Sequence, residues 1–148
     1  MSDDGTIEIS CDRDRLDIDA IHEFLTQSYW SPGVPKEVVC KAIANSLCFG
    51  VFQGTRQIGF ARVTTDKATF AYLADVFVLE EFRGQGLGKR LIASVMAHPE
   101  LQGLRRFMLA TRDAHQLYAR YGFTPIAAPS RLMEVLRPDV YREELPDR

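Results

Sequence analysis

Three glycines, Gly84, Gly86 and Gly88, lie within five positions of the stretch EEFRGQGLGKRLIASVMAH (80–98), just before a helix-like run. Glycine loses more conformational freedom on folding than other residues, so three close together require an explanation. A glycine bend that leads into a helix points backbone N–H groups at one spot, beside the positive end of the helix dipole. That spot suits a phosphate or pyrophosphate. The alternative is a bend needed only for tight packing of a strand against a helix.

The residues around the bend add positive charge but match neither of two common phosphate loops. Lys89 and Arg90 follow the last glycine directly. A Walker loop requires a glycine where Arg83 stands, and Ser or Thr where Arg90 stands. A dinucleotide-binding fingerprint reads G-x-G-x-x-G, whereas this bend reads G-x-G-x-G and follows a series of strand-like runs. Both motifs are therefore excluded.

Tyr118, in the stretch DAHQLYARYGF (113–123), has a side chain that could donate a proton. A phenol has an unperturbed pKa of about 10, so it stays protonated at neutral pH and can act as a general acid. The alternative is an aromatic core residue, at helical spacing with Leu117 and Tyr121. At the start of the same stretch, Asp113 is a natural N-cap for the helix.

Asp75 is the charged residue of an otherwise apolar strand-like run, AYLADVFV (71–78). A carboxylate in such a place is either a general base or a structural anion with a partner. Strand alternation puts Asp75 on the face opposite Ala74 and Val76, unless a bulge changes the parity.

The hydrophobic pattern predicts the elements that position these residues. Strands are expected at 6–10, 47–53, 56–66, 69–79, 103–112, 124–128 and 131–137, and helices at 17–30, from Pro35 to about 46, from the glycines to about 98, and at 113–123. The order is β-α-α-β-β-β-α-β-α-β-β. The three runs from 47 to 79 have short turns between them and predict an antiparallel meander. The strand–bend–helix–strand unit that follows is a crossover, so strands 69–79 and 103–112 should be parallel neighbours. An α/β (α+β) fold follows, with a mixed, mostly antiparallel, twisted sheet of about seven strands and helices on both faces.

Composition indicates an ordinary globular chain. The 148 residues, 46% of them hydrophobic and 26% charged, predict a single domain over 1–148, with the tail 138–148 peripheral. A net charge of -2 argues against nucleic acid or an anionic membrane as partner. No apolar run approaches the roughly 20 residues of a spanning helix. The acidic start is unlike a secretory signal, and Cys11, Cys40 and Cys48 lack metal-type spacing, so a cytoplasmic protein without a metal is expected.

Two stretches resemble the motifs of the GNAT superfamily, the acyl-CoA-dependent N-acyltransferases. VFVLEEFRGQGLGKRLI (76–92) is similar to the family's acyl-CoA signature, Q/R-x-x-G-x-G/A after a strand that ends in Val, with Arg83, Gly86 and Gly88 at the matching positions. AHQLYARYGF (114–123) resembles the second motif, A-x-x-L-Y-x-x-x-G-F. The resemblance extends over about residues 6–137.

The resemblance implies binding of acetyl-CoA, as co-substrate, in a splay between strands 69–79 and 103–112. Main-chain groups of Val76 and Val78 would pair with the pantetheine arm, and the N–H of Val76 or its neighbour would stabilise the oxyanion. Backbone N–H groups of the bend would hold the pyrophosphate; these belong to Arg83, Gly84, Gln85, Gly86, Leu87, Gly88 and Lys89. Tyr118 falls on the family's general-acid position. Thr111 stands where many relatives have an asparagine that touches pantetheine or orients the tyrosine.

The acceptor site is expected to involve the segments 28–37 and 127–136. Tyr29 and Trp30 either roof an apolar or cationic group by stacking or cover the core. Tyr72, expected on the Val76 face, either lines the pocket or is a plain core aromatic. Glu134, in a late strand, either contacts the acceptor or faces solvent.

Together, these expectations predict an enzyme that transfers an acetyl group from acetyl-CoA to a primary amine of a small molecule or amino acid. The amine would attack directly, with Tyr118 as general acid. The alternative is a non-catalytic acyl-CoA-binding sensor or regulatory module. A homodimer is one alternative for the assembly, because homodimers are common among the proteins that the chain resembles, but no feature of the sequence identifies an interface.

Overall fold

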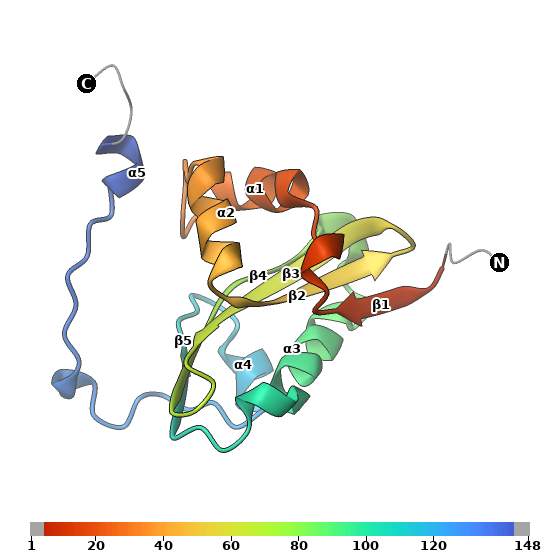
Figure 1. Cartoon of the computed structure of the whole chain (residues 1–148). Coiled ribbons are helices and arrows are strands. Elements are labelled where there is room, and N and C mark those ends of the chain that lie inside the picture. The colour runs from red at the N-terminus through yellow and green to blue at the C-terminus, as the bar shows by residue number, and fades with distance from the viewer. Residues whose placement is uncertain (1–4, 144–148) are drawn as a thin grey trace.

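Within residues 5–143, which the computed structural model describes, five strands form one sheet in the order β1-β2-β3-β4-β5 (Figure 1). The strands are β1 Ile7–Ser10, β2 Leu47–Gln53, β3 Arg56–Thr65, β4 Phe70–Val78 and β5 Arg106–Leu109. The pairs from β1 to β4 are antiparallel, and β5 joins β4 in parallel. The predicted meander and the predicted parallel pair are both confirmed.

Helices cover both faces of the sheet, which confirms the predicted α/β class. They are α1 Ile18–Thr26, α2 Lys36–Ala44, α3 Leu87–Ala97, α4 His115–Ala119 and α5 Val140–Glu143. In Figure 1, α1 and α2 lie on one face of the sheet, and α3 and α4 lie on the other. Each layer encloses its own core cluster. Ile21, Val39 and Phe60 belong to the α1–α2 side, and Val63, Leu73 and Leu91 to the α3 side.

The two layers follow from local sequence signals. Asp17 begins α1, where its carboxylate accepts a 3.1 Å hydrogen bond from the N–H of Ala20. Pro35 is the N-cap of α2, directly before the first helical residue, where its missing N–H costs no hydrogen bond of the helix. Both helices then bury apolar residues at helical spacing toward the sheet, as amphipathic helices do.

A β-bulge interrupts β4 at Asp75. Phe60 of β3 lies opposite Phe77, whereas Arg62 lies opposite Ala74, so β4 holds one extra residue between these pairs. Asp75 has φ 59°, in the left-handed region. The bulge reverses the alternation of faces: Leu73 packs in the α3-side core, but Phe77 stacks on Phe24 of α1, with ring centroids 3.9 Å apart.

The bulge corrects one prediction about Tyr72. Simple alternation put Tyr72 on the same face as Val76. Val76 instead packs against the α3-side core together with Leu73, the neighbour from which Tyr72 points away. The sequence analysis allowed for a bulge that would change which face each side chain of this strand occupies, and the structure has that bulge.

The predicted strands 124–128 and 131–137 are wrong, so the sheet has five strands instead of about seven. Within the described residues, 124–139 contain no strand: they form a bend at Ala127, a short 3₁₀ turn, Pro129–Arg131, and a turn at 138–139, and we call this segment the C-terminal arm. The arm runs away from the β5 edge and ends at α5, beside α2 (Figure 1). A strand requires a neighbour with which to exchange hydrogen bonds, and residues 5–143 provide none for the arm.

In the part of the chain that the structure describes, the longest helix is α3, with 11 residues. No helix there combines the length and apolar character needed to cross a bilayer.

Candidate functional site

The glycine bend keeps open space at the start of α3. Gly84 has φ 84° and Gly86 has φ 78°, backbone conformations that favour glycine. Gly86 is the N-cap of α3, and no side chain caps the helix there. A Cβ atom added at Gly84, Gly86 or Gly88 would meet no protein atom within 4 Å. Packing of the chain on itself therefore does not require a glycine at position 88, which weakens the packing interpretation of the bend.

Backbone N–H groups of the bend are unpaired. Among residues 5–143, the N–H groups of residues 84–89 donate no hydrogen bond to another residue. Several of them belong to the first turn of α3, where the helix dipole is positive and backbone donors have no acceptor within the helix. A row of free donors at such a helix start is suited to an anion with several oxygen atoms.

The basic side chains around the bend differ in their contacts. Arg83 turns back, and its Nε donates a 2.8 Å hydrogen bond to the carbonyl of Val78 at the end of β4. Arg90 donates to the carbonyl of Ile7 in β1. Lys89 is exposed, and its side chain has no partner among the described residues. Lys89 is thus the cation of the bend that remains available to a ligand.

The strands β4 and β5 separate beside the bend. Their ladder ends at the pair Leu73–Leu109, and β4 continues to Val78 without a neighbour on that side. The N–H of Leu79 bonds the carbonyl of Ile58 in β3, so alternation turns the N–H groups of Val76 and Val78 away from β3, toward the splay. These are the two residues expected to pair with an extended ligand.

A cleft of about 250 Å³ occupies the splay. From β4 it is lined by Tyr72, Leu73, Ala74, Asp75 and Val76, from the other side by Leu109, Ala110, Thr111, Asp113, Ala114 and Tyr118, and from above by Tyr29 and Trp30. The structure thus brings together the sequence-predicted residues Tyr118, Asp75, Val76, Thr111, Tyr29, Trp30 and Tyr72.

Tyr118 lies on α4 and is 8% exposed. Its ring meets Phe123 edge-on, with centroids 6.0 Å apart, which fixes its place against the core. Burial, together with the neighbouring Tyr29, raises the pKa of the phenol above its usual value. The hydroxyl has no hydrogen-bond partner among residues 5–143, although the residue lines the cleft. It is a protonated donor whose acceptor must come from a ligand or from water.

Thr111 places α4. Its Oγ1 accepts a 3.0 Å hydrogen bond from the N–H of Ala114, the N-cap residue of the helix. The predicted N-cap role of Asp113 is therefore wrong. A hydroxyl three residues upstream takes that backbone donor, and the Asp113 side chain instead lines the cleft. Asp113 is a cleft residue that the sequence reasoning missed, because a carboxylate before a helix is more often its cap.

Tyr29 and Trp30 form the roof of the cleft, in the loop between α1 and α2. Their rings meet edge-on, with centroids 5.1 Å apart. The guanidinium of Arg112 lies 3.7 Å from the centroid of the Tyr29 ring. A cation of the chain itself therefore occupies the Tyr29 face by a cation–π contact. This contact joins the roof to the segment that follows β5.

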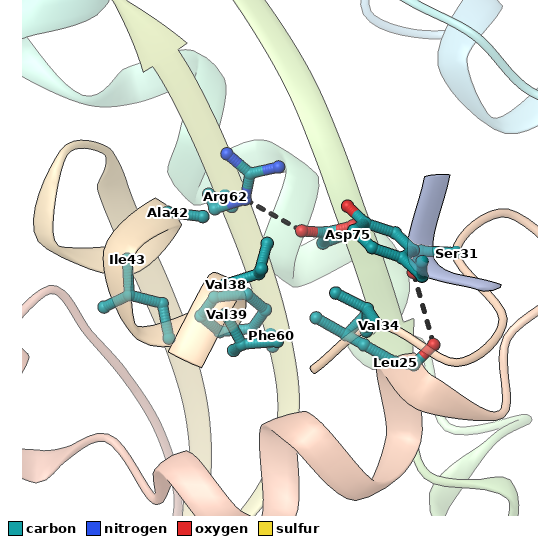
Figure 2. Close-up of a pocket in the computed structure, with 11 residues that line it drawn as sticks. Leu25, Ser31, Val34, Val38, Val39, Ala42, Ile43, Phe60, Arg62 and Asp75 are labelled. Carbon is teal, nitrogen blue, oxygen red and sulfur yellow. Dashed lines mark hydrogen bonds and ion pairs between the residues drawn. The ribbon is translucent and has the colours of Figure 1, made fainter. Parts of the chain in front are cut away.

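Asp75 links the roof to the sheet. One carboxylate oxygen accepts a 2.9 Å hydrogen bond from the indole nitrogen of Trp30, and the other accepts a 2.8 Å hydrogen bond from Nε of Arg62. The side chains of Arg62 and Asp75 are 20% and 12% exposed, so the ion pair is partly buried. Figure 2 shows Arg62 directed at Asp75 beside a small pocket between α1, α2 and the sheet. These contacts favour the structural alternative for Asp75.

Glu134 is not brought to the cleft. It lies on the C-terminal arm, where the side chain is exposed, and it is not among the residues that line the cleft. Among the described residues, no group of three or more His, Cys, Asp or Glu side chains could hold a metal ion. The polar groups that line the cleft are backbone amides, the phenols of Tyr29, Tyr72 and Tyr118, the Trp30 indole, the Thr111 hydroxyl and the carboxylates of Asp75 and Asp113.

Comparison with known proteins agrees with this geometry. A family model described as "Acetyltransferase (GNAT) domain" matches residues 44–125, which include β2 to β5, the bend and α4. A curated protein of Gibberella zeae, described as an acetyltransferase, is 32% identical over 139 residues, with 78% of this chain and 77% of that protein covered.

Solved structures show the same fold. A GNAT-family protein from Xanthomonas campestris pv. campestris, described as an acetyltransferase, is 57% identical with a TM-score of 0.89, over 91% of this chain and 96% of that one. A Clostridium acetobutylicum structure described as an acetyltransferase with acetyl-CoA is 12% identical, with a TM-score of 0.65 over 88% and 96% of the chains, and shares the fold alone. With a family match over more than half of its length and these relatives, the chain belongs to the GNAT family and is an acyltransferase.

Proposed function

We propose that this protein transfers an acetyl group from acetyl-CoA to the primary amine of a small molecule or amino acid, in the cytoplasm, by direct attack and with Tyr118 as general acid. One observation carries the proposal: the row of unpaired N–H groups at residues 84–89 continues into a splayed strand pair that ends at the Tyr118 side chain. Anion site, extended groove and proton donor thus follow one another along a single path.

The bend is suited to the diphosphate of coenzyme A. The free amides of residues 84–89 would donate to its oxygen atoms, and Lys89 would add a positive charge. The open space above Gly84, Gly86 and Gly88 would let the anion approach the main chain closely. The open space is consistent with a bound diphosphate, because side chains at these three positions would fill the volume that the ligand needs.

The free edge of β4 would bind the pantetheine arm as an added strand does. The N–H groups of Val76 and Val78 point into the splay, about 6.6 Å apart along the strand, so an extended amide chain could accept hydrogen bonds from both. An acyl thioester supplies an electrophilic carbonyl and a thiolate leaving group. The Val76 amide lines the cleft at the bulge and would donate to the carbonyl oxygen as negative charge develops on it.

Tyr118 would protonate the departing sulfur. Its raised pKa keeps the phenol protonated across neutral pH, and its hydroxyl has no competing acceptor among residues 5–143. The amine would enter the cleft beneath Tyr29 and Trp30, with Tyr72 and Asp113 in its wall. Since both oxygens of Asp75 already accept hydrogen bonds, we assign deprotonation of the amine to solvent and not to Asp75.

The test joins a binding measurement to a turnover measurement. Calorimetry with coenzyme A should give one site per chain, and a thiol-release assay with acetyl-CoA should respond to members of a panel of small amines and amino acids. Binding without release on any amine would favour a non-catalytic sensor and contradict the proposal. Absence of binding would contradict the assignment of the bend itself.

A further inference from the structure

Arg112 connects the far wall of the cleft to its roof. It lies in the chain between Thr111 and Asp113, and both of these neighbours line the cleft. Its guanidinium carbon lies 3.7 Å from the centroid of the Tyr29 ring in the roof. The guanidinium is therefore at the rim of the cleft, between the segment that follows β5 and the loop between α1 and α2.

The contact with Tyr29 holds the guanidinium but leaves its N–H groups free. Stacking uses the flat face of a guanidinium, whereas its five N–H groups point outward from its edges. Among residues 5–143, the Arg112 side chain donates no hydrogen bond and forms no ion pair. Arg62, by contrast, donates three hydrogen bonds to other side chains. The hydrogen bonds of Arg112 must therefore go to water or to a ligand.

The same contact decides which charge the roof offers to a substrate at this point. An aromatic face can bind a cationic group, and this is one of the two roles expected of Tyr29. Arg112 already occupies a face of the Tyr29 ring, so the roof presents a positive charge there. The group of an acceptor that complements this charge is an anion.

Asp113 supplies the opposite charge in the wall of the cleft. In the part of the chain that the structure describes, its carboxylate accepts no hydrogen bond and forms no ion pair, not even with the adjacent Arg112. Asp75, the other carboxylate of the cleft, is paired with Arg62. Neighbouring unpaired charges of opposite sign are complementary to a zwitterion, and Asp113 repels a dianionic phosphate more strongly than a carboxylate. The rim of the cleft therefore favours an amine that also carries a carboxylate.

The rim is near the proposed proton donor. Tyr29 and Tyr118 line the same cleft of about 250 Å³. Burial, and after it the neighbouring Tyr29, raises the pKa of the Tyr118 phenol, which places the ring that carries Arg112 close to that phenol. An acceptor bound to Arg112 therefore needs to extend only across this small cleft to bring its amine beside the thioester.

We propose that Arg112 binds the carboxylate of the acceptor, and that the acceptor is a free amino acid. The guanidinium donates two parallel hydrogen bonds to the two carboxylate oxygens, for which its planar fork is suited. Stacking on Tyr29 holds the guanidinium before the acceptor arrives, so less side-chain entropy is lost on binding. The inference rests on the proposed function and deepens it, because it states which amines the cleft selects.

Paired acceptors provide the first test. Each free amino acid is compared with the amine that lacks its carboxylate, for example phenylalanine with 2-phenylethylamine, and glycine is compared with aminomethylphosphonate. In the thiol-release assay, the amino acid of the most active pair should have a KM at least tenfold lower than that of its amine. Equal KM values in every pair would overturn the inference and leave the proposed acyl transfer standing. A lower KM for the phosphonate than for glycine would overturn it as well.

Fluorescence of Trp30 measures acceptor binding without turnover. Trp30 is the only tryptophan of the chain and lies in the roof of the cleft. With coenzyme A bound, the amino acid should change this fluorescence with a Kd at least tenfold lower than that of its matched amine. This preference without thiol release on any amine would contradict the proposed function and leave the carboxylate site standing. Absence of the preference in this titration would overturn the carboxylate site.

Variants of Arg112 separate a carboxylate-binding role from a structural role in the roof. Arg112→Gln should raise the KM for the amino acid about 10- to 100-fold, because the charged hydrogen bonds are lost, and should leave the KM for the matched amine within about twofold. Arg112→Lys keeps the charge without the planar fork and should lie between Arg112→Gln and wild type. Coenzyme A affinity should stay unchanged in both variants.

The matched control is Arg120→Gln, which removes the same charge from an exposed position at the end of α4. This variant should leave both KM values unchanged. If Arg112→Gln raises the two KM values by the same factor, Arg112 only supports the roof, and the inference is wrong. If Arg120→Gln raises the KM for the amino acid as much as Arg112→Gln does, the effect comes from net charge, and the inference is also wrong.

Discussion

The indole nitrogen of Trp30 donates a 2.9 Å hydrogen bond to a carboxylate oxygen of Asp75. The two residues are 45 positions apart, and their contact joins the roof of the cleft to the bulge of β4. Arg62 binds the second oxygen of the same carboxylate. One side chain thus sets the height of the roof above the strand whose amides face the cleft.

We expect Asp75→Asn to lower stability while leaving the pH dependence of turnover unchanged. Asparagine tolerates the left-handed backbone of position 75, so the bulge persists. The guanidinium of Arg62 loses its charged partner in a partly buried place, which should cost about 1–3 kcal/mol of the free energy of unfolding. Denaturant unfolding and a pH–rate profile measure the two effects.

The control for this variant is Glu81→Gln. Glu81 pairs with Arg56 in an exposed ion pair, so the same chemical change there should lower stability much less than Asp75→Asn does. If Asp75→Asn removes the acidic limb of the pH–rate profile while Glu81→Gln does not, Asp75 is the general base, and its structural assignment is wrong.

Gly86→Asp should abolish binding of coenzyme A, because a carboxylate would enter the anion site with a like charge. The matched control is Gly103→Asp. Gly103 also has positive φ, 72°, and an added Cβ also meets open space, but it lies in the turn before β5. Both variants should lose roughly 1 kcal/mol of stability from backbone strain, and only Gly86→Asp should lose binding in calorimetry. Equal affinity of the two variants for coenzyme A would show that the diphosphate does not bind at the bend.

Gly88→Ala should raise the stability of the protein while it weakens the binding of coenzyme A. Position 88 is within α3 and lacks positive φ, so alanine should stabilise the helix by about 0.5–1 kcal/mol. Its methyl group would project into the space that we assign to the anion. A higher melting temperature together with weaker coenzyme A binding is expected, and unchanged affinity would contradict the close approach of the ligand.

Tyr118→Phe should reduce the rate of thiol release by about 10²- to 10⁴-fold, with little change in coenzyme A affinity, because the phenol acts on the departing sulfur. Tyr121→Phe is the control. The Tyr121 hydroxyl donates to the carbonyl of Lys89, so its loss should cost about 1 kcal/mol of stability with turnover retained. Equal rates in Tyr118→Phe and wild type would exclude Tyr118 as the acid.

Cys48 should make stability fall at alkaline pH. Burial raises the pKa of its thiol from 9.0 to about 11 in the folded chain. A raised pKa gives a contribution that is complete below pH 9 and is lost as the pH rises toward 11. Urea unfolding of Cys48→Ala should therefore depend less steeply on pH in this window than unfolding of Cys40→Ala, in which an exposed thiol is removed. Tyr118, whose pKa is also raised, keeps part of the dependence in both variants.

Thiol modification at pH 8 provides an independent readout of the same burial. The exposed Cys40 should react first, and Cys48 should react roughly a hundredfold more slowly because its thiolate is scarce and covered. Comparable rates for the two thiols would show that the α1–α2 layer opens readily over β2.

The sequence by itself determined the features that depend on neighbouring residues along the chain. The bend at Gly84 and Gly86, the helix that follows and the parallel pair β4–β5 could all be predicted, because periodicity, glycine chemistry and the handedness of crossovers act over short segments. Spacing alone left Tyr118 as either a core aromatic or a functional residue, and the resemblance to the second GNAT motif favoured the functional position; Tyr118 does line the cleft.

Only the tertiary structure decided the features that depend on pairing between segments distant in the sequence. The bulge at Asp75 arises where β4 must satisfy β3 on one edge and pack Phe77 against α1, and no local pattern specifies which residue is added. The run 131–137 alternates like a strand, yet it forms no ladder with any other segment that the structure describes, because a strand exists only with a neighbour. Alternation in sequence predicts the two faces of a strand, but the partner at its edge is a property of the assembled fold.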